Sequence, residues 1–260
     1  ENQNMIKAVF LDIDGTLLSN TTGQIPKSAG EAIDSMRMNG VKVFTATGRH
    51  MSEIRDLPVD DIRFDGYITL NGQLCLDSRK ELLYGEAIGE RDVELMLAMF
   101  EEKKVPVMLV EKDRMYINYI DELVEKAQAA INTPVPEIGT YSGEPIYQFI
   151  LYSEERMAEE IVAGLDGCKM TRWNPYGVDI ISKNGGKVAG IRQILQDCGI
   201  RQNEIMAFGD GENDMDMLRY AGIGVAMGNA EEDVKVCADY ITDDVEKDGI
   251  EKACKYFKMI

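Results

Sequence analysis

The chain has 260 residues, of which 45% are apolar and 28% are charged. These values are typical of a globular protein, and the length allows one large or two modest domains. The 46 acidic and 28 basic side chains give a net charge of −18. This charge argues against nucleic acid and anionic membranes as partners, because both bind positively charged protein surfaces.

The five cysteines are widely spaced and form no CxxC pair, so neither a disulfide framework nor a zinc site is expected. No apolar run reaches the length of a membrane span. Asp12 and Asp14 also fall where the apolar region of a signal peptide would continue. We therefore expect a cytoplasmic protein, either a monomer or a homodimer. The sequence leaves open whether residues 1–4, which precede Met5, are native.

The first 80 residues alternate between apolar strands and amphipathic helices, in the order strand 6–11, helix 26–39, strand 41–45, helix 51–57 and strand 67–70. Short, continuously apolar strands separated by helices are typical of a parallel sheet that is covered on both faces. This part of the chain is therefore predicted to begin an α/β domain.

The middle of the chain has a different pattern, which begins with a hairpin at 74–76 and 82–84. Helices are then expected at 92–104, 121–131 and 154–163. Strands are expected at 107–110, 115–118, 146–151, 169–173 and 178–181. Hairpins mixed with helices favour an α+β unit with an antiparallel sheet.

The α/β alternation returns near Gly185 and continues to the end of the chain. The expected elements are helix 187–197, strand 204–208, helix 214–221, strand 224–227, helix 231–237, strand 240–241 and a helix from 248. We therefore predict a Rossmann-like parallel-sheet core from residues 1–80 and 184–260, with an α+β unit inserted at 81–183.

Two acidic motifs follow predicted core strands. Asp12 and Asp14 belong to DIDGT at 12–16, and GDGEND at 209–214 contains Asp210, Asn213 and Asp214. Ligands in open α/β sheets gather at the carboxyl ends of strands, so the carboxylates are expected to converge. Such a cluster requires a cation, and oxygen ligands beside phosphate favour Mg²⁺. Taken alone, each motif also fits an ordinary turn, and the glycine position excludes an EF-hand.

The Asp12 and Asp14 pair suits phosphoryl transfer. One carboxylate can attack phosphorus to form an aspartyl-phosphate, and the other can exchange protons with the leaving alcohol and with water.

Two further segments carry candidate phosphate-binding groups. Thr47, Gly48 and Arg49 follow the second strand, where a hydroxyl and backbone N–H groups could hold phosphate oxygens, although Thr47 also fits a helix N-cap. Arg49 could contact substrate or pair with a nearby acid. Lys183 and Lys187 flank Asn184-Gly185-Gly186, and either ammonium could balance the carboxylates; Lys187 is preferred because it begins a helix.

In combination, DIDGT at 12–16, ATGR at 46–49, NG at 71–72, the glycine–lysine segment at 185–187 and GDGEND resemble the haloacid dehalogenase superfamily, specifically its Cof-like, type IIB sugar-phosphate phosphatases. The resemblance implies that Asp12 is the nucleophile and Asp14 the acid/base, the latter also a metal ligand through its backbone carbonyl. It further implies that Thr47 and Lys187 bind phosphate and that Asp210 ligates Mg²⁺, with Asn213 and Asp214 in support.

The same resemblance makes the inserted unit a cap that selects the substrate. Asn71 and Asp179 are then expected at the substrate, and Trp173 and Tyr176 could stack on a sugar or simply pack. The expected activity is hydrolysis of small phosphorylated metabolites, with hexose or pentose phosphates favoured. A phosphosugar mutase and a phosphosugar-binding sensor with little turnover remain as alternatives.

Overall fold

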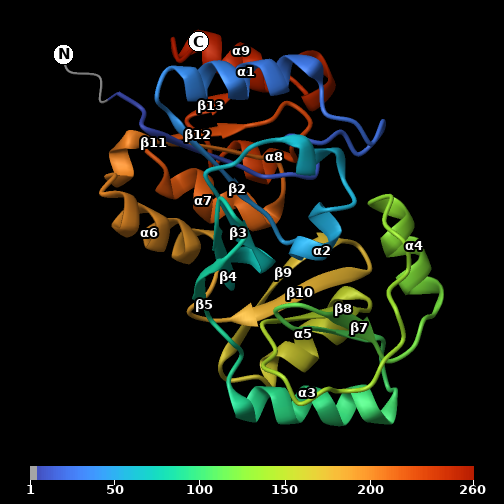
Figure 1. Cartoon of the computed structure of the whole chain (residues 1–260). Coiled ribbons are helices and arrows are strands. Elements are labelled where there is room, and N and C mark those ends of the chain that lie inside the picture. Colours follow the sequence, from blue (N-terminus) through green and yellow to red (C-terminus); the bar gives the residue numbers. More distant parts are fainter. Residues whose placement is uncertain (1–4) are drawn as a thin grey trace.

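The computed structural model describes residues 5–260 and contains two units, each built on its own sheet (Figure 1). The larger unit, which we call the core, is formed by both ends of the chain around an eight-stranded sheet of order β13-β12-β11-β1-β2-β3-β4-β5. The smaller unit, which we call the cap, has a five-stranded sheet of order β7-β6-β8-β10-β9. Residues 1–4, whose origin the sequence leaves open, lie outside the described residues.

The core strands are short, and all but β5 and β13, at the two edges of the sheet, are largely buried, as their apolar sequences predict. They are β1 (Ala8–Leu11), β2 (Lys42–Ala46), β3 (Gly66–Thr69), β4 (Leu74–Asp77), β5 (Leu82–Gly85), β11 (Ile205–Gly209), β12 (Ile223–Ala226) and β13 (Tyr240–Ile241). In the centre, β1 pairs in parallel with β2 and β11, so that Ala8 lies opposite Lys42 and Ile205. This pairing brings residues from the two ends of the chain into one sheet.

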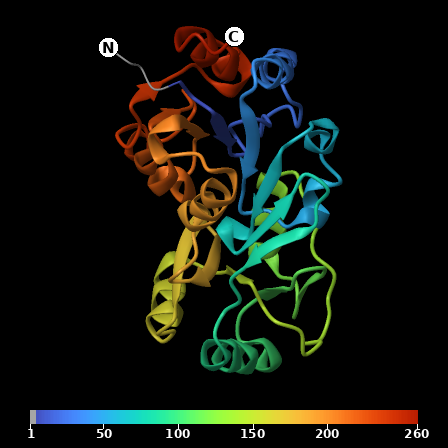
Figure 2. The same ribbon diagram turned by 60° about the vertical axis from the view of Figure 1, so that its left-hand side comes forward.

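Helices cover both faces of the core sheet. They are α1 (Lys27–Met38), α2 (Met51–Ile54), α6 (Lys187–Cys198), α7 (Met215–Tyr220), α8 (Glu232–Lys235) and α9 (Gly249–Tyr256). Ile33 of α1 and Ile250 of α9 belong to the apolar cluster on one face, where blue α1 and red α9 lie side by side (Figure 2). Ile191 of α6 and Leu218 of α7 belong to the cluster on the other face.

Helix α2 is shorter than the expected 51–57. The backbone of Leu57 is in the extended conformation, and a 3-10 helix with Pro58 in its first position follows. The ring of a proline disfavours the helical conformation of the residue before it, which explains the early end.

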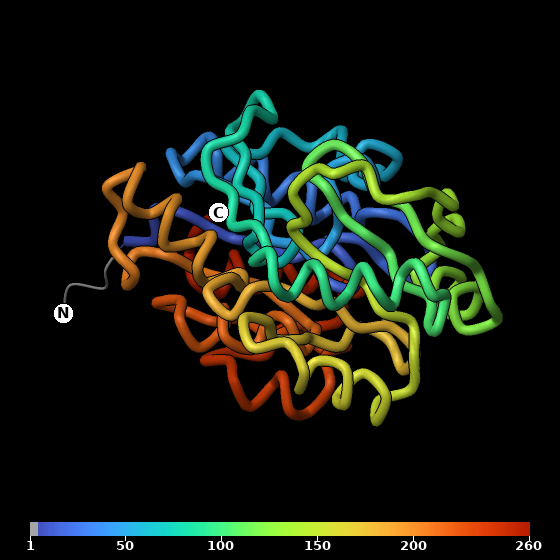
Figure 3. Tube along the Cα trace, turned by 90° about the horizontal axis from the view of Figure 1, so that it is seen from below, coloured from blue at the N-terminus to red at the C-terminus, as the bar shows by residue number. Residues whose placement is uncertain are grey.

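The cap sheet consists of β6 (Val107–Val110), β7 (Met115–Ile117), β8 (Gln148–Tyr152), β9 (Cys168–Asn174) and β10 (Gly177–Ser182), all paired antiparallel. Helices α3 (Glu90–Glu102) and α5 (Glu155–Ala163) pack on one face of it. The other face meets α4 (Glu122–Ala130) and, through Leu70 and Leu74, the core. Seen from below, the green and yellow cap lies in front of the core (Figure 3).

The predicted fold class, a parallel α/β core with an inserted α+β cap, is confirmed. One boundary differs: β5 pairs antiparallel with β4, with Leu74 opposite Gly85, so the core sheet extends past residue 80. The hairpin partner of a core strand stays in the core sheet, and the chain enters the cap only between Gly85 and Glu90. Among residues 5–260, no helix combines the length and apolar composition of a membrane span.

Candidate active site

The strand ends converge as parallel pairing requires. β1, β2 and β11 end at Leu11, Ala46 and Gly209, so Asp12, Thr47 and Asp210 follow at one edge of the core sheet. The N–H of Asp12 continues the ladder to the carbonyl of Phe208 over 3.1 Å. Motifs separated by about two hundred positions in sequence thus share one site beside the cap.

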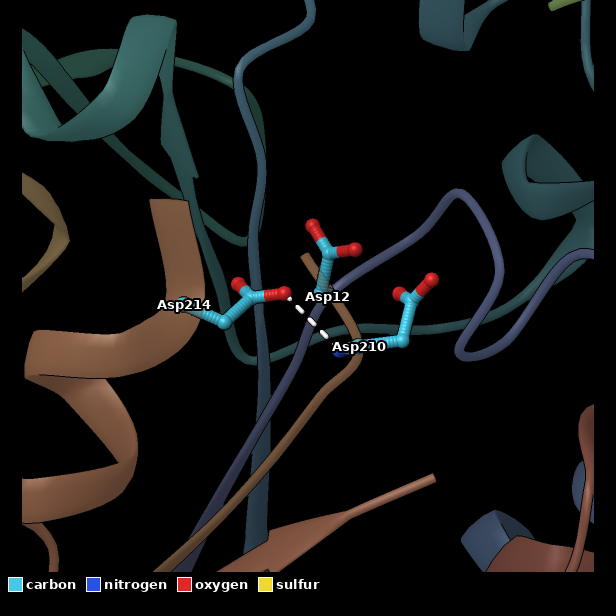
Figure 4. Close-up of side chains that lie close together, drawn as sticks. All are labelled: Asp12, Asp210 and Asp214. Atoms are coloured by element: carbon cyan, nitrogen blue, oxygen red, sulfur yellow. Dashed lines mark hydrogen bonds between the residues drawn. The ribbon is translucent and has the colours of Figure 1, made fainter. Parts of the chain in front are cut away.

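Three carboxylates form a compact cluster at this edge. Asp12, Asp210 and Asp214 each offer an oxygen that lies within 4.8 Å of the others, and Figure 4 shows the three side chains next to each other. Asp214 accepts hydrogen bonds from the N–H groups of Asp210 and Gly211, at 3.0 and 2.9 Å, which closes the turn after β11. Thr16 donates to Oδ1 of Asp210 over 2.8 Å.

Glycine at position 15 lets the two acidic segments approach. Its φ is +79°, and a Cβ at this position would lie 2.1 Å from Oδ2 of Asp210. A side chain would therefore displace the Asp210 carboxylate from the cluster. Asn229, which the sequence analysis missed, steadies the same loop by donating to the carbonyl of Gly15 over 2.8 Å.

Lys187 supplies the positive charge of the cluster. Its ammonium, at the start of α6, is 2.8 Å from Oδ1 of Asp12 and 2.5 Å from Oδ1 of Asp214, and the residue is only 3% exposed. Lys183 is exposed and donates instead to the carbonyl of Asp166 over 2.6 Å. Of the two candidate lysines, Lys187 is the one that faces the carboxylates.

One ammonium does not balance three buried carboxylates. Burial, together with the charge of Asp214, raises the pKa of Asp12 to about 7 despite the opposing effect of Lys187. The pKa of Asp210 is also raised well above its ordinary value, by burial and by the charges of Asp12 and Asp214. A hard divalent cation with oxygen ligands would fit this excess of buried negative charge.

The side chain of Asp14 turns away from the cluster. Its two oxygens accept from Nε and Nη2 of Arg49, at 2.7 and 2.8 Å. Arg49 also lies 3.6 Å from Glu53, one of the acids expected as a partner. The metal-ligand role of the Asp14 backbone carbonyl stays a prediction.

Thr47 is buried and lines the cavity at the site, but it does not cap the following helix. Its Oγ1 accepts from the N–H of Arg49 over 3.0 Å. The N-cap of α2 is instead His50, whose side chain accepts from the N–H of Ser52. His50 also reaches the cap, where Nε2 is 2.8 Å from the carbonyl of Lys112.

Asn71 links the loop after β11 to the cap. Its Nδ2 donates to Oδ2 of Asp179 over 2.7 Å and to Oε1 of Gln148 over 3.1 Å, and its Oδ1 accepts from Asn213 over 3.0 Å. Asn71 has a left-handed backbone, with φ of 53°. The side-chain amide of Asn213 therefore points to that of Asn71.

Gly48 lies directly against the cap. A Cβ there would be 3.0 Å from Oδ2 of Asp179, and its carbonyl accepts from Gln148 over 3.3 Å. Gln148 was not predicted as a site residue. Its position as a lone polar residue in the apolar strand 146–151 could have indicated a specific hydrogen-bonding role. Burial, opposed by the Asn71 hydrogen bond, raises the pKa of Asp179 to about 7.

A cavity of about 810 Å³ opens between the core and the cap. Its core side carries the catalytic candidates, and its cap side is largely apolar, with Met108, Ile150, Tyr152 and Trp173. Trp173 and Tyr152 meet edge to face, with ring centroids 6.3 Å apart. Tyr176 is not among the lining residues, so of the two aromatic candidates only Trp173 is placed to contact a ligand.

Known proteins share this architecture over the whole chain. A model of the haloacid dehalogenase-like hydrolases matches residues 9–254. The Bacillus subtilis protein YkrA is 30% identical over 257 residues, which cover 98% of both chains. The solved structure of BT4131, a haloacid dehalogenase subclass IIB sugar phosphatase, is 39% identical with a TM-score of 0.87 and covers 98% of this chain and 100% of its own.

A further relative in Bacillus subtilis is the 5-amino-6-(5-phospho-D-ribitylamino)uracil phosphatase YcsE, which is 28% identical over 258 residues, 98% of this chain and 96% of YcsE. The family model covers all but the ends of the chain, and the fold agrees with that of the solved subclass IIB structure. The chain therefore belongs to the haloacid dehalogenase-like hydrolase family, in its Cof-like branch.

Proposed function

We propose that this chain hydrolyses sugar phosphates, with Mg²⁺ as cofactor and an aspartyl-phosphate intermediate on Asp12. Phosphoric monoester hydrolysis is the activity of its family, so the chain is a phosphatase of the haloacid dehalogenase type. The metal, the sugar and the covalent intermediate are the parts that we propose.

The observation that carries the proposal is the buried carboxylate of Asp12, held 2.8 Å from the Lys187 ammonium at the wall of the cavity. An oxygen of Asp12 attacks phosphorus as the bond to the leaving oxygen breaks, and the carboxylic acid of Asp14 gives that oxygen its proton. Asp14 then takes a proton from water, whose oxygen attacks the aspartyl-phosphate. Inorganic phosphate leaves and Asp12 is restored.

Asp12 and Asp210, together with the backbone carbonyl of Asp14, would hold Mg²⁺. The oxygens of Asp214 are committed to Lys187 and to two backbone N–H groups, which suits a supporting place beside the ion. When bound, Mg²⁺ supplies positive charge that offsets the charges of the carboxylates and of the phosphate. Thr47 and Lys187 are the protein groups placed to bind phosphate oxygens.

The cap side of the cavity supports a substrate with both polar and apolar faces. Asp179 can accept hydrogen bonds from sugar hydroxyls, and Trp173 offers a flat surface for a sugar ring. The sugar phosphatase BT4131 favours this choice. The apolar wall of Met108, Ile150 and Tyr152 also favours a second candidate, a sugar-alcohol phosphate that carries a heterocycle, as in the name of YcsE.

A panel of phosphorylated sugars, nucleotides and cofactors tests the substrate class. We expect inorganic phosphate release to be fastest from hexose or pentose phosphates. Faster release from a ribitylamino-pyrimidine phosphate would favour the second candidate. Isomer formation without free phosphate would indicate a mutase, and tight sugar-phosphate binding with negligible turnover would indicate a sensor.

Removal of the metal provides a separate test. EDTA should abolish phosphate release, and Mg²⁺ should restore it. Because Mg²⁺ binds only the folded cluster, it should also raise the melting temperature. Asp210→Asn should lose most of that rise, whereas Asp216→Asn, which alters an exposed acid on α7, should keep it. A rate that is insensitive to EDTA would contradict the proposed cofactor.

A further inference from the structure

The side chain of Arg49, a core residue, links the proposed acid/base Asp14 to the cap. Its guanidinium donates twice to the carboxylate of Asp14, at 2.7 and 2.8 Å. The remaining donors face the segment after α4, where Nη1 is 3.0 Å from Oγ1 of Thr133 and Nη2 is 3.3 Å from the carbonyl of Ile131. Arg49 is 6% exposed, so few of its N–H groups are left for water or substrate.

The end of α4 is well suited to receive this cation. The helix ends at Ala130, and Ile131 is its C-cap, so the last carbonyls carry the partial negative charge of the helix end. The hydroxyl of Thr133 donates to the Ile131 carbonyl over 3.1 Å, which orients its lone pairs towards Arg49. Asn132 makes a second contact with the core by donating to the carbonyl of Asn20 over 3.0 Å.

The carboxylate of Asp14 depends on this arrangement. Within residues 5–260, Arg49 is its only side-chain partner, and the Asp14 side chain is still 26% exposed. A carboxylate held by two hydrogen bonds to one guanidinium has a defined orientation, and that orientation persists only while the guanidinium is itself fixed. Two of the contacts that fix it come from the cap.

We propose that Arg49 is a positioning residue that ties Asp14 to the end of α4, so that proton transfer is efficient only while the cap is docked on the core. This inference rests on the proposed role of Asp14 as acid/base. It gives Arg49 a role that differs from both expected ones, contact with substrate and simple pairing with a nearby acid. It also assigns a function to Thr133, which lies outside the cavity lining.

Thr133→Val tests the proposal, with Thr133→Ser as the matched control. Valine keeps the shape but loses the hydroxyl that bonds Arg49, whereas serine keeps that hydroxyl. The two probes are glucose 6-phosphate, whose alkoxide must be protonated as it leaves, and p-nitrophenyl phosphate, whose phenolate leaves without a proton. kcat/KM is the quantity to compare, because it reports the step in which the leaving group departs.

We expect Thr133→Val to lower kcat/KM about tenfold for glucose 6-phosphate, the loss typical of a hydrogen bond to a charged group, and to change it less than about twofold for p-nitrophenyl phosphate. Thr133→Ser should resemble the wild type with both esters. Arg49→Lys should lower kcat/KM selectively for glucose 6-phosphate in the same way, with a larger loss. An ammonium keeps the charge, but it cannot donate at the same time to the two carboxylate oxygens of Asp14 and to the hydroxyl of Thr133.

Equal losses with both esters would overturn the proposal, since they would mean that Thr133 only stabilises the closed cap. Unchanged kcat/KM in Thr133→Val would overturn it too. Melting temperatures of the variants separate these outcomes from misfolding. Failure of the proposed function would look different, because the wild-type protein would then release no phosphate from either ester.

Discussion

The two sides of the cavity differ sharply in charge. The core contributes seven carboxylates, from Asp12, Asp14, Glu53, Asp210, Glu212, Glu231 and Asp233. The cap contributes one carboxylate, that of Asp179, and one guanidinium, that of Arg172, next to Met108, Ile150, Tyr152 and Trp173. The core side is therefore built around charges that need compensation, and the cap side around shape and apolar surface.

This difference indicates how the two units divide the work. Buried carboxylates such as Asp12 and Asp210, with raised pKa values, are costly for folding and are useful only where a phosphate and a cation bind. An apolar wall costs nothing to bury, and it can change without disturbing the chemistry. Changes in the core should thus affect turnover, and changes in the cap should affect substrate choice.

The largest effect should come from Asp12→Asn. The amide is nearly isosteric but is a poor nucleophile, so we expect phosphate release to fall by at least about 10⁴-fold. Folding should survive, because the change also removes one negative charge from the cluster. Circular dichroism and a melting curve provide the control for folding. Substantial residual phosphate release would show that another group attacks phosphorus.

The next effect should come from Lys187→Met. It leaves Asp12 and Asp214 buried without their ammonium, and breaking a buried ion pair costs about 3 kcal/mol or more of unfolding free energy. Phosphate release should fall by about 100-fold or more, since the charge that balances Asp12 is lost. Denaturant unfolding and initial rates measure the two effects.

Lys183→Met is the matched control, because within residues 5–260 the exposed ammonium of Lys183 donates only to the carbonyl of Asp166. Its stability and activity should remain near those of the wild type. If the two variants lost activity equally, the assignment of Lys187 would be wrong.

Much of the core could be predicted from the sequence, because its motifs directly follow short apolar strands. Parallel pairing brings such strand ends to one edge, so the grouping of Asp12, Asp210 and Asp214 follows from topology alone. The sequence supports only a preference between Lys187 and Lys183 as the partner of the carboxylates. The structure distinguishes them, because Lys187 is the first residue of α6 and is buried.

The contacts between core and cap could not be predicted in the same way. The partners of Arg49 and Asn71 lie about 80 to 110 positions away, in Thr133 and Asp179, and no local pattern relates them. These contacts depend on how the two sheets are placed relative to one another. That placement is a tertiary property, to which hydrophobic periodicity gives no access.

The last prediction concerns the pH dependence of stability and not turnover, and it involves Asp179, the one carboxylate that the cap adds to the cavity. Its pKa is about 7 in the folded protein, against an ordinary value of 3.8, chiefly because of burial. Between these two values the folded state binds a proton that the unfolded state releases. The stability contributed by this group is therefore complete below the lower value and is lost as the pH rises through 7.

Asp179→Asn removes that dependence, since asparagine stays neutral and can still accept the hydrogen bond from Asn71. Relative to the wild type, the variant should gain roughly 3 to 4 kcal/mol of unfolding free energy as the pH rises from about 4 to about 8. Urea denaturation without Mg²⁺ across this range measures the difference. Asp113→Asn, at a cap side chain that is 86% exposed, should show no such trend.

A constant difference between Asp179→Asn and the wild type would mean that Asp179 is already ionised in the folded cap at acidic pH. The cap would then carry a full negative charge against the acidic core, and the contrast between the two sides of the cavity would be weaker than burial implies. A rising difference would instead show that the cap meets the core with a neutral group below pH 7, which lets Asp179 lie against Asn71 without adding to the excess of negative charge around Asp12.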